Sequence, residues 1–236
     1  MTSRRSELAG SRQDMWASRN DPEYLEGYSE LIPIRRWLAK IVTLYHPKSV
    51  LELGCNVGAN LQAIHQIDPT IELAGLDIHP PAIELAKKRL PQGQFVVGSL
   101  YDAAKLFNRK FDIVFTCGVL IHIPPDMLPV AKEQIDALAR MASIHIEEHG
   151  QPRERKWDGG IPVRWVHDYQ TLFPNAHIYT PVVGINGNGA HDLMLTKPLH
   201  GARAFWYLTM YPRLFTWKER IILRFKVRGW RALIPV

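Results

Sequence analysis

Acidic and glycine residues stand at the ends of two predicted strands, in an arrangement that suits a bound nucleotide. An apolar run over residues 50–53 contains Glu52, and Gly54 and Gly58 then form a turn that leads into a predicted helix. Such a turn lets the backbone approach a ligand closely and leaves free amide groups at the helix start. Asp77 ends the next predicted strand, where a carboxylate can accept hydrogen bonds from both hydroxyls of a ribose. The pattern therefore predicts a cofactor that carries a ribose.

The turn lacks the glycine spacing of a nicotinamide dinucleotide site. That fingerprint is G-x-G-x-x-G around a pyrophosphate, whereas here Asn56 occupies the middle position and Gly54 and Gly58 lie four residues apart. We therefore expect a ribose-bearing cofactor of another kind.

Three side chains are candidates for work on a substrate. His122 follows the fourth predicted strand, and the basicity of His near neutral pH suits a general base. The alternative for His122 is a buried side chain bonded to backbone. Glu147 and Glu148 close the fifth predicted strand, where a carboxylate could bind hydroxyls or an amine of a substrate, or could be solvated charge.

Basic residues surround an irregular segment over residues 151–163, which is predicted to be a loop or a short hairpin. Arg153, Arg155, Lys156 and Arg164 could bind a phosphate or carboxylate of a substrate, or could face water. His145 and His149 lie four residues apart with acids between them, but this pair spans the end of a predicted strand and not a helix, as the zinc motif requires. We therefore predict no metal site.

Alternating strand and helix patterns must position these residues. Nearly all-apolar strands that alternate with helices favour an α/β fold, in which helices cover both faces of a parallel sheet. The last two strands flank a Gly- and Asn-rich stretch, 186–189, which predicts a hairpin and an antiparallel end to the sheet. Strands are predicted over residues 49–53, 72–78, 94–97, 112–117, 143–147, 176–179 and 193–196, and helices over 60–66, 81–90, 125–141 and 165–172.

Four segments are expected along the chain. Residues 1–20 are polar and are predicted to be flexible. Residues 21–46 carry apolar residues at helical spacing and should form an N-terminal helical cap, which Pro33 divides into two helices. Residues 47–197 hold the strand–helix alternation. Residues 198–236 form a basic, aromatic C-terminal extension that contains helices.

Three stretches resemble motifs of class I S-adenosylmethionine-dependent methyltransferases. Residues 51–61, 75–78 and 111–123 are similar to the first, second and fourth motifs of that family. The resemblance implies a Rossmann-like, seven-stranded, mostly parallel sheet with an antiparallel last strand, and S-adenosyl-L-methionine as cofactor. The family usually has an acid after the third strand, where this chain has Ser99. The expected cofactor-binding residues are Glu52, Gly54, Cys55, Asn56, Gly58, Asp77, Ile78, Ser99, Leu100, Cys117 and Gly118.

A narrower likeness concerns the substrate. Residues 118–123, 165–169 and 172–174 resemble parts of methylases associated with pseudaminic acid biosynthesis. We therefore expect methyl transfer to an oxygen or nitrogen of a small molecule, with a sugar or cell-surface glycan precursor preferred. Two alternatives stay open: a membrane-surface methyltransferase that acts on a lipid or quinone, and a non-catalytic regulator that binds S-adenosylmethionine.

The positive charge of the chain belongs to its C-terminal extension. The net charge of the chain is +6, and residues 198–236 carry eight Lys or Arg residues against one acid, Glu219. With its interleaved aromatic residues, this segment suits an anionic membrane surface or packing on protein, and nucleic acid is the least favoured partner. Two cysteines, no signal-peptide pattern and no apolar run of membrane-spanning length predict a cytoplasmic protein. Peripheral attachment to the inner membrane surface is the alternative.

Overall fold

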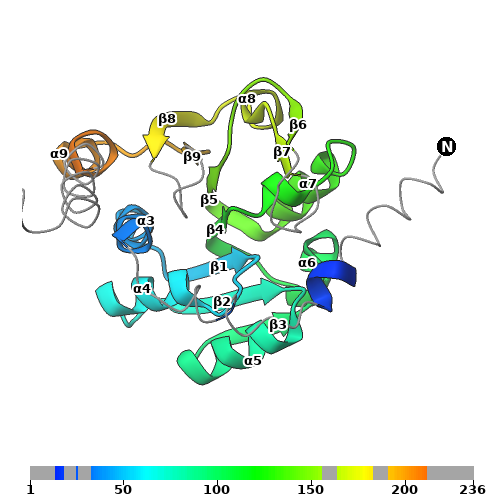
Figure 1. Cartoon of the computed structure of the whole chain (residues 1–236). Coiled ribbons are helices and arrows are strands. Elements are labelled where there is room, and N and C mark those ends of the chain that lie inside the picture. Colours follow the sequence, from blue (N-terminus) through cyan, green and yellow to red (C-terminus); the bar gives the residue numbers. More distant parts are fainter. Residues whose placement is uncertain (1–13, 19–24, 26–32, 156–163, 183–190, 212–236) are drawn as a thin grey trace, which may run out of the picture. The chain divides into compact units, whose positions relative to one another are not determined.

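Figure 1 shows a computed structural model of the chain, which describes residues 14–18, 25, 33–155, 164–182 and 191–211. The chain divides into two compact units, Met1–Pro198 and Leu199–Val236. This division falls one residue beyond the predicted start of the basic extension. All the strands described below belong to the first unit.

A seven-stranded sheet forms the centre of the first unit, with the strand order β3-β2-β1-β4-β5-β9-β8. Strands β1 to β5 run parallel, whereas β9 is antiparallel to both of its neighbours. The expected Rossmann-like sheet with an antiparallel last strand is thereby confirmed. The strands are β1 (Ser49–Leu53), β2 (Glu72–Asp77), β3 (Gln94–Val97), β4 (Phe111–Cys117), β5 (Ala139–Glu147), β8 (His177–Val182) and β9 (His191–Leu195).

Helices cover both faces of this sheet. Figure 1 shows α3 and α4 on one side of the strands and α6, α7 and α8 on the other. The second group shares one hydrophobic core with residues of β1, β2, β4 and β9, which include Leu51, Leu76 and Met194. Burial on both faces explains why the strands are almost wholly apolar. The helices are α3 (Pro33–Thr43), α4 (Ala59–Ile67), α5 (Pro80–Arg89), α6 (Ala103–Phe107), α7 (Leu128–Leu138) and α8 (Tyr169–Leu172), with 3₁₀ turns η1 (Leu100–Asp102) and η2 (Leu120–His122).

The carboxyl ends of the parallel strands meet at one edge of the sheet. Leu53 pairs with Leu76 and Cys117 pairs with Ile146, so the residues that follow these four lie side by side. After β1 the chain proceeds outward to β2 and β3, and it then crosses back to place β4 on the other side of β1. Ligands of open α/β sheets bind at this point of reversal. The fold thus brings the predicted cofactor residues to the expected edge.

Two predicted helices differ from the structure. The helix expected over 125–141 ends at Leu138, because the chain is already extended at Ala139 and continues as β5. The helix expected over 165–172 was wrong in its first half, since Arg164–Val166 form strand β7, paired with β6 (Arg153–Arg155). Helix α8 begins only after Asp168, whose carboxylate accepts from the N–H groups of Gln170 and Thr171. Only β6 of this pair lies in the segment 151–163 that was predicted to be a loop or a short hairpin, and residues 156–163 lie outside the described residues.

Several expectations fall outside the described residues. Helix α3 begins at Pro33 as predicted. The helix expected before it, the hairpin tip at 186–189 and a helix starting at Pro212 lie outside the described residues. The second unit is described over α9 (Ala202–Phe205) and η3 (Trp206–Met210). Among the described helices, none combines the length and the apolar character that crossing a membrane requires.

Candidate active site

The turn between β1 and α4 is held against the ends of two other strands. The N–H groups of Gly54 and Cys55 both donate to Leu76 O, at 2.7 and 2.9 Å. Gly54 has a φ of +77°, and a Cβ there would lie 2.3 Å from Cγ2 of Val119, in the loop after β4. Glycine is therefore required at this position because two loops touch there, in addition to any approach of a ligand.

Asp77 fixes the glycine turn with its carboxylate. Oδ2 accepts from Asn56 N at 2.7 Å, and Oδ1 accepts from His79 N at 2.9 Å. Burial raises the pKa of Asp77, and these backbone hydrogen bonds oppose the shift. Each carboxylate oxygen has a further lone pair, so Asp77 can hold the turn and still accept hydrogen bonds from two hydroxyls.

Glu52 and Asn60 present acceptor atoms that have no donor within the described part of the chain. Oε1 of Glu52 accepts from Nδ2 of Asn60 at 2.6 Å, but Oε2 of Glu52 and Oδ1 of Asn60 are buried without a hydrogen-bond partner. Burial raises the pKa of Glu52 to about 8, an effect that the hydrogen bond from Asn60 and the charge of Arg35 oppose. Unsatisfied buried acceptors are costly. An ammonium group, with three donors and a positive charge, satisfies both.

The expected adenine side lies at the ends of β2 and β3. Gly98 N donates to Asp77 O at 2.9 Å, which joins these strand ends. Ser99 Oγ accepts from Tyr101 N at 3.2 Å and so caps η1. Ile78, Ser99 and Leu100 are all partly exposed there. Ser99, which stands where the family usually has an acid, therefore caps η1 in addition to any contact with the adenine ring.

Neither cysteine is activated. Burial raises the pKa of the Cys55 and Cys117 thiols, and nearby acids add to the shift in both cases. A protonated thiol is a poor nucleophile. The two side chains therefore line the expected cofactor edge as small neutral groups.

Glu147 anchors the loop that follows β4. Its side chain is wholly buried. Oε1 accepts from Thr116 Oγ1 at 2.8 Å and from Val119 N at 3.0 Å, and Oε2 accepts from Ile121 N at 3.3 Å. Burial raises the pKa of Glu147 to about 7 against these hydrogen bonds. Gly118 N also donates to Ile146 O, at 2.9 Å, so β5 sets the position of this loop.

A chain of buried polar groups continues from Glu147 through β5. Oγ1 of Thr116 lies 2.9 Å from Nδ1 of His145, and Nε2 of His145 lies 2.9 Å from Oγ of Ser143. Ser143 N donates to Oγ1 of Thr196 at 2.7 Å. Burial lowers the pKa of His145 to about 3, so this imidazole is neutral at physiological pH.

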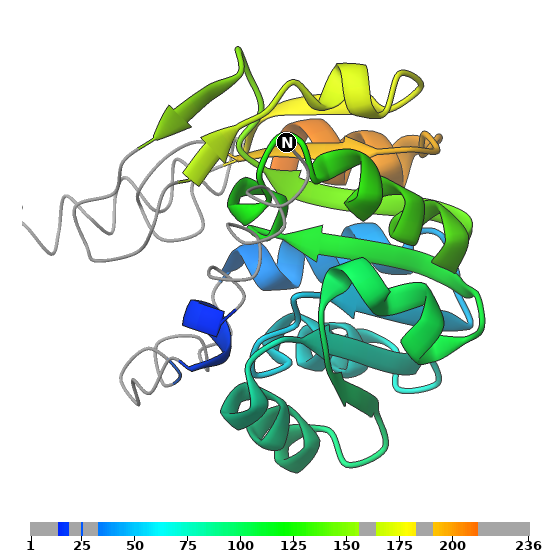
Figure 2. The ribbon, with the colours of Figure 1, turned by 90° about the vertical axis from the view of Figure 1, so that its right-hand side faces the viewer.

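His122, the predicted base, lies in η2 with its ring partly exposed. Its ring contacts Trp16 edge-on, with 5.0 Å between the ring centroids. Figure 2 shows residues 14–17, in dark blue, at the edge toward which β4 points. The N-terminal segment thus contributes an aromatic side chain to this edge.

The remaining predicted residues are less closely grouped. Oε1 of Glu148 lies 3.7 Å from Nη2 of Arg153 on β6. Arg155 and Arg164 pair across the β6–β7 hairpin, while Lys156 lies outside the described residues. Within the described ranges, no group of three or more His, Cys, Asp or Glu residues is arranged to hold a metal ion.

Sequence patterns did not indicate three residues of this edge. Arg35 acts on Glu52 from α3, and Trp16 comes from a segment predicted to be flexible. Asp192 lies opposite Glu147 on β9. Asn60 was also not assigned a role from the sequence. Unlike the three residues above, it had a sequence signal, because it is the last residue of the glycine motif.

Residues 51–143 match a family model described as a methyltransferase domain. Together with the sheet order and the residues at its carboxyl edge, this match supports the resemblance of this part of the chain to class I S-adenosylmethionine-dependent methyltransferases. The resemblance seen in the sequence motifs is thereby confirmed. S-adenosylmethionine is the cofactor of this class, and the acceptor atoms of Glu52, Asn60 and Asp77 fit its ammonium and ribose groups.

Two curated relatives are similar over about half of the chain. Demethylmenaquinone methyltransferase of Thermotoga maritima is 28% identical over 129 residues, which are 53% of this chain and 56% of that protein. Trans-aconitate 2-methyltransferase of Escherichia coli (strain SE11) is 26% identical over 148 residues, 57% of this chain and 58% of that protein. The chain thus spans somewhat more than half the length of these relatives.

A solved structure shares the fold. S-adenosylmethionine-bound CalS10, an amino pentose methyltransferase from Micromonospora echinaspora, superposes with a TM-score of 0.58 at 12% sequence identity. The match covers 76% of this chain and 99% of CalS10.

Proposed function

We propose that this protein is an enzyme that transfers the methyl group of S-adenosylmethionine to an oxygen or nitrogen of a small molecule. The observation that carries the proposal is the pair of buried acceptors on Glu52 and Asn60 that no described residue satisfies, beside Asp77 at the reversal point of the sheet. This arrangement supports a ligand that offers an ammonium group and hydroxyls together.

The cofactor residues act by binding and orientation. Glu52 and Asn60 receive the ammonium group, Asp77 receives the ribose hydroxyls, and Ile78, Ser99 and Leu100 surround the adenine. Gly54, Cys55, Asn56 and Gly58 form the turn beneath the methionine portion, with Cys117 and Gly118 on the adjoining strand end. When bound, S-adenosylmethionine supplies an electrophilic methyl group on a sulfonium, and the acceptor atom needs alignment with it more than strong acid–base help.

His122, Glu147 and Glu148 differ in what they can do for the acceptor. The partly exposed ring of His122 can take a proton from an acceptor hydroxyl. Both carboxylate oxygens of Glu147 accept hydrogen bonds, from Thr116, Val119 and Ile121. We therefore assign Glu147 the role of positioning the loop that carries His122. Glu148, which is paired with Arg153 at 3.7 Å, is the acid that we propose for contact with polar groups of the acceptor. A sugar or glycan precursor, rich in such groups, is the acceptor we favour.

Calorimetric titration with S-adenosylmethionine and S-adenosylhomocysteine, with NAD as a control, tests the proposal. We expect micromolar binding of both sulfur compounds and none of NAD. Absence of binding to well-folded protein would refute the cofactor site. Binding without methyl transfer to any acceptor, assayed as S-adenosylhomocysteine release across sugars, acids, amines and quinones, would instead favour a regulatory protein.

A second candidate function is methyl transfer at an anionic membrane surface, to a lipid or quinone. Phe205, Trp206 and Met210 in the second unit are exposed, Phe205 by 63%, within a segment that carries a net charge of +7. Exposed aromatic residues among cations are typical of interfacial segments. The name of the Thermotoga maritima relative includes a quinone substrate, so demethylmenaquinone belongs among the acceptors tested.

A further inference from the structure

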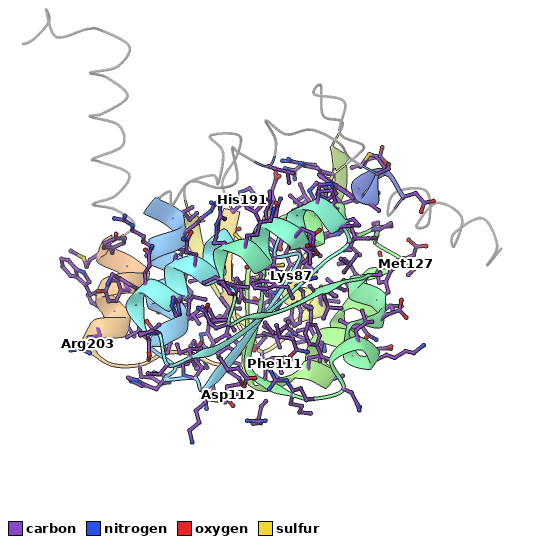
Figure 3. The ribbon with its side chains drawn as sticks, turned by 90° about the horizontal axis from the view of Figure 1, so that it is seen from below. Lys87, Phe111, Asp112, Met127, His191 and Arg203 are labelled. Carbon is purple, nitrogen blue, oxygen red and sulfur yellow. The ribbon has the colours of Figure 1, made fainter. Side chains whose placement is uncertain are left out.

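The N-terminal segment contacts the ring of the candidate base. Residues 14–17 form one helical turn, and the indole of Trp16 meets the imidazole of His122 with 5.0 Å between the ring centroids and 66° between the ring planes. Figure 3 shows this turn, in dark blue, at the end of the molecule away from Phe111 and Asp112, with which β4 begins. Trp16 therefore lies at the carboxyl edge of the sheet, where we propose that methyl transfer takes place.

A second contact fastens the same segment to the glycine turn. Leu25 packs against the buried side chains of Val57, Ala59 and Ala82. Val57 lies in the turn before α4, Ala59 begins α4, and Ala82 lies in the first turn of α5. The described parts of the N-terminal segment thus contact both the loop after β4 and the turn after β1. The position of Trp16 is therefore part of how this edge is built.

The backbone on both sides of His122 is fixed from within the fold. Glu147 accepts from Ile121 N at 3.3 Å, and Nε2 of His167 donates to Ile123 O at 3.1 Å. Both of these partners are buried, Glu147 completely and His167 to 3% exposure. The sheet side therefore sets the backbone of the candidate base, while Trp16 packs against its ring from the N-terminal segment.

The indole of Trp16 also offers a surface to a ligand. The residue is partly exposed, and a contact between two inclined rings covers at most one face of the indole. A large apolar ring at a binding edge gains free energy when the flat face of a ligand covers it. Aromatic rings such as those of quinols have flat faces, and sugar rings present C–H groups on one side. Trp16 therefore favours a ring compound as the methyl acceptor.

We propose that Trp16 is an acceptor-binding residue, whose indole packs against a ring of the methyl acceptor and turns a hydroxyl of that ring toward His122. The same side chain limits the orientations of the His122 imidazole, so it aligns the base and the acceptor together. No bond forms or breaks on Trp16. This inference rests on the proposed function, because it assigns the substrate class of the same site, a ring compound that carries a hydroxyl.

Matched probes with and without a flat ring test the inference. With the protein saturated in S-adenosylhomocysteine, we would titrate 2-naphthol against its puckered counterpart decahydro-2-naphthol, and glucose against open-chain sorbitol. We expect the first member of at least one pair to bind about fivefold or more tightly than the second, and the pair that responds distinguishes an aromatic acceptor from a sugar. Trp16→Ala should abolish this preference, and Trp16→Phe, which keeps an aromatic face, should retain it. Met15→Ala removes the neighbouring apolar side chain of the same turn and is the matched control, which should behave as wild type.

Cofactor affinity and melting curves separate acceptor binding from other roles of Trp16. Because the residue is partly exposed and contacts the acceptor side, Trp16→Ala should keep the melting temperature and the S-adenosylhomocysteine affinity of the wild type. A loss of that affinity would assign Trp16 to the cofactor, and a lower melting temperature would assign it a structural role. Either result, or a ring preference that is absent from the wild type or survives in Trp16→Ala, would overturn the inference and leave the proposed function standing. Failure of the wild type to bind S-adenosylhomocysteine would refute the proposed function itself.

Discussion

Glu52 and Asp77 end neighbouring strands, but the protein satisfies only one of them. Asp77 accepts two backbone N–H groups, whereas one oxygen of Glu52 has no donor among the described residues. Asp77 therefore holds the backbone of the glycine turn in the free protein, whereas Glu52 accepts one side-chain hydrogen bond, from Asn60, and keeps its second oxygen for a ligand. Substitution at the two positions should accordingly have different consequences.

Asp77→Ala should weaken binding of S-adenosylmethionine at least tenfold, which is about 1.4 kcal/mol, because two ribose hydrogen bonds to a carboxylate are lost. Calorimetry measures the effect, and Asp136→Ala on α7 serves as a control for loss of an exposed acid. Unchanged affinity in Asp77→Ala would show that the ribose binds elsewhere.

Glu52 should make the free protein less stable as the pH rises. Its pKa is about 8 in the folded protein and about 4.3 in an unfolded chain, so the folded state binds more protons between these values. Stability then falls as pH increases from about 5 to 8. The melting temperature of Glu52→Gln should fall less over this range, and S-adenosylhomocysteine should flatten the wild-type curve. Parallel curves for the two proteins would contradict the assignment.

The turn between β1 and α4 shows how an element depends on the one beside it. Gly54 and Gly58 have similar φ values, +77° and +73°, but a Cβ on Gly58 would lie 3.2 Å from the nearest atom, against 2.3 Å for Gly54. The left-handed conformation alone costs a non-glycine residue about 1–2 kcal/mol. The clash with Val119 adds to this cost only at Gly54.

Gly54→Ala should therefore destabilise the protein more than Gly58→Ala, which should lose about 1–2 kcal/mol. Because Val119 must move, Gly54→Ala should also disturb the loop that Glu147 holds. Urea unfolding of both variants provides the comparison. Equal losses would mean that Val119 adapts without cost.

Local sequence signals predicted most of the elements because strands buried on both faces are apolar and helices of this fold begin at Gly or Pro turns. These signals failed where the structure of a segment depends on pairing or contact with residues that are distant in the sequence. Trp165, Val166 and Tyr169 have helical spacing, yet Trp165 and Val166 belong to β7 because they pair with β6. The cofactor motif was visible as a contiguous stretch. Arg35 and Asp192 were not, since only the folded sheet brings them to the same edge.

At the scale of the whole molecule, the chain combines a unit that contains the match to a methyltransferase domain with a basic second unit. The family match ends at residue 143, well before the second unit begins at Leu199. Exposed aromatic residues and positive charge coincide in that unit, which is the basis for proposing an anionic surface as a partner.

Phe205→Ser combined with Trp206→Ser, in the full chain, should reduce binding to phosphatidylglycerol vesicles at least tenfold and leave cofactor affinity unchanged, because apolar insertion is lost. Leu106→Ser, which removes a hydrophobic side chain of 40% exposure from α6, is the matched control. Vesicle sedimentation measures the change. If wild-type protein does not sediment with these vesicles, the membrane proposal is refuted.

The buried chain from Glu147 to Thr196 links His145 to the protonation state of Glu147. The hydroxyl of Thr116 donates to Glu147 and also lies 2.9 Å from Nδ1 of His145. On the other side of the ring, Oγ of Ser143 lies 2.9 Å from Nε2 and donates to Oγ1 of Thr196. When Glu147 gains a proton it no longer needs the hydrogen of Thr116, so the nitrogen NMR signals of His145 should change and report this event from within the sheet.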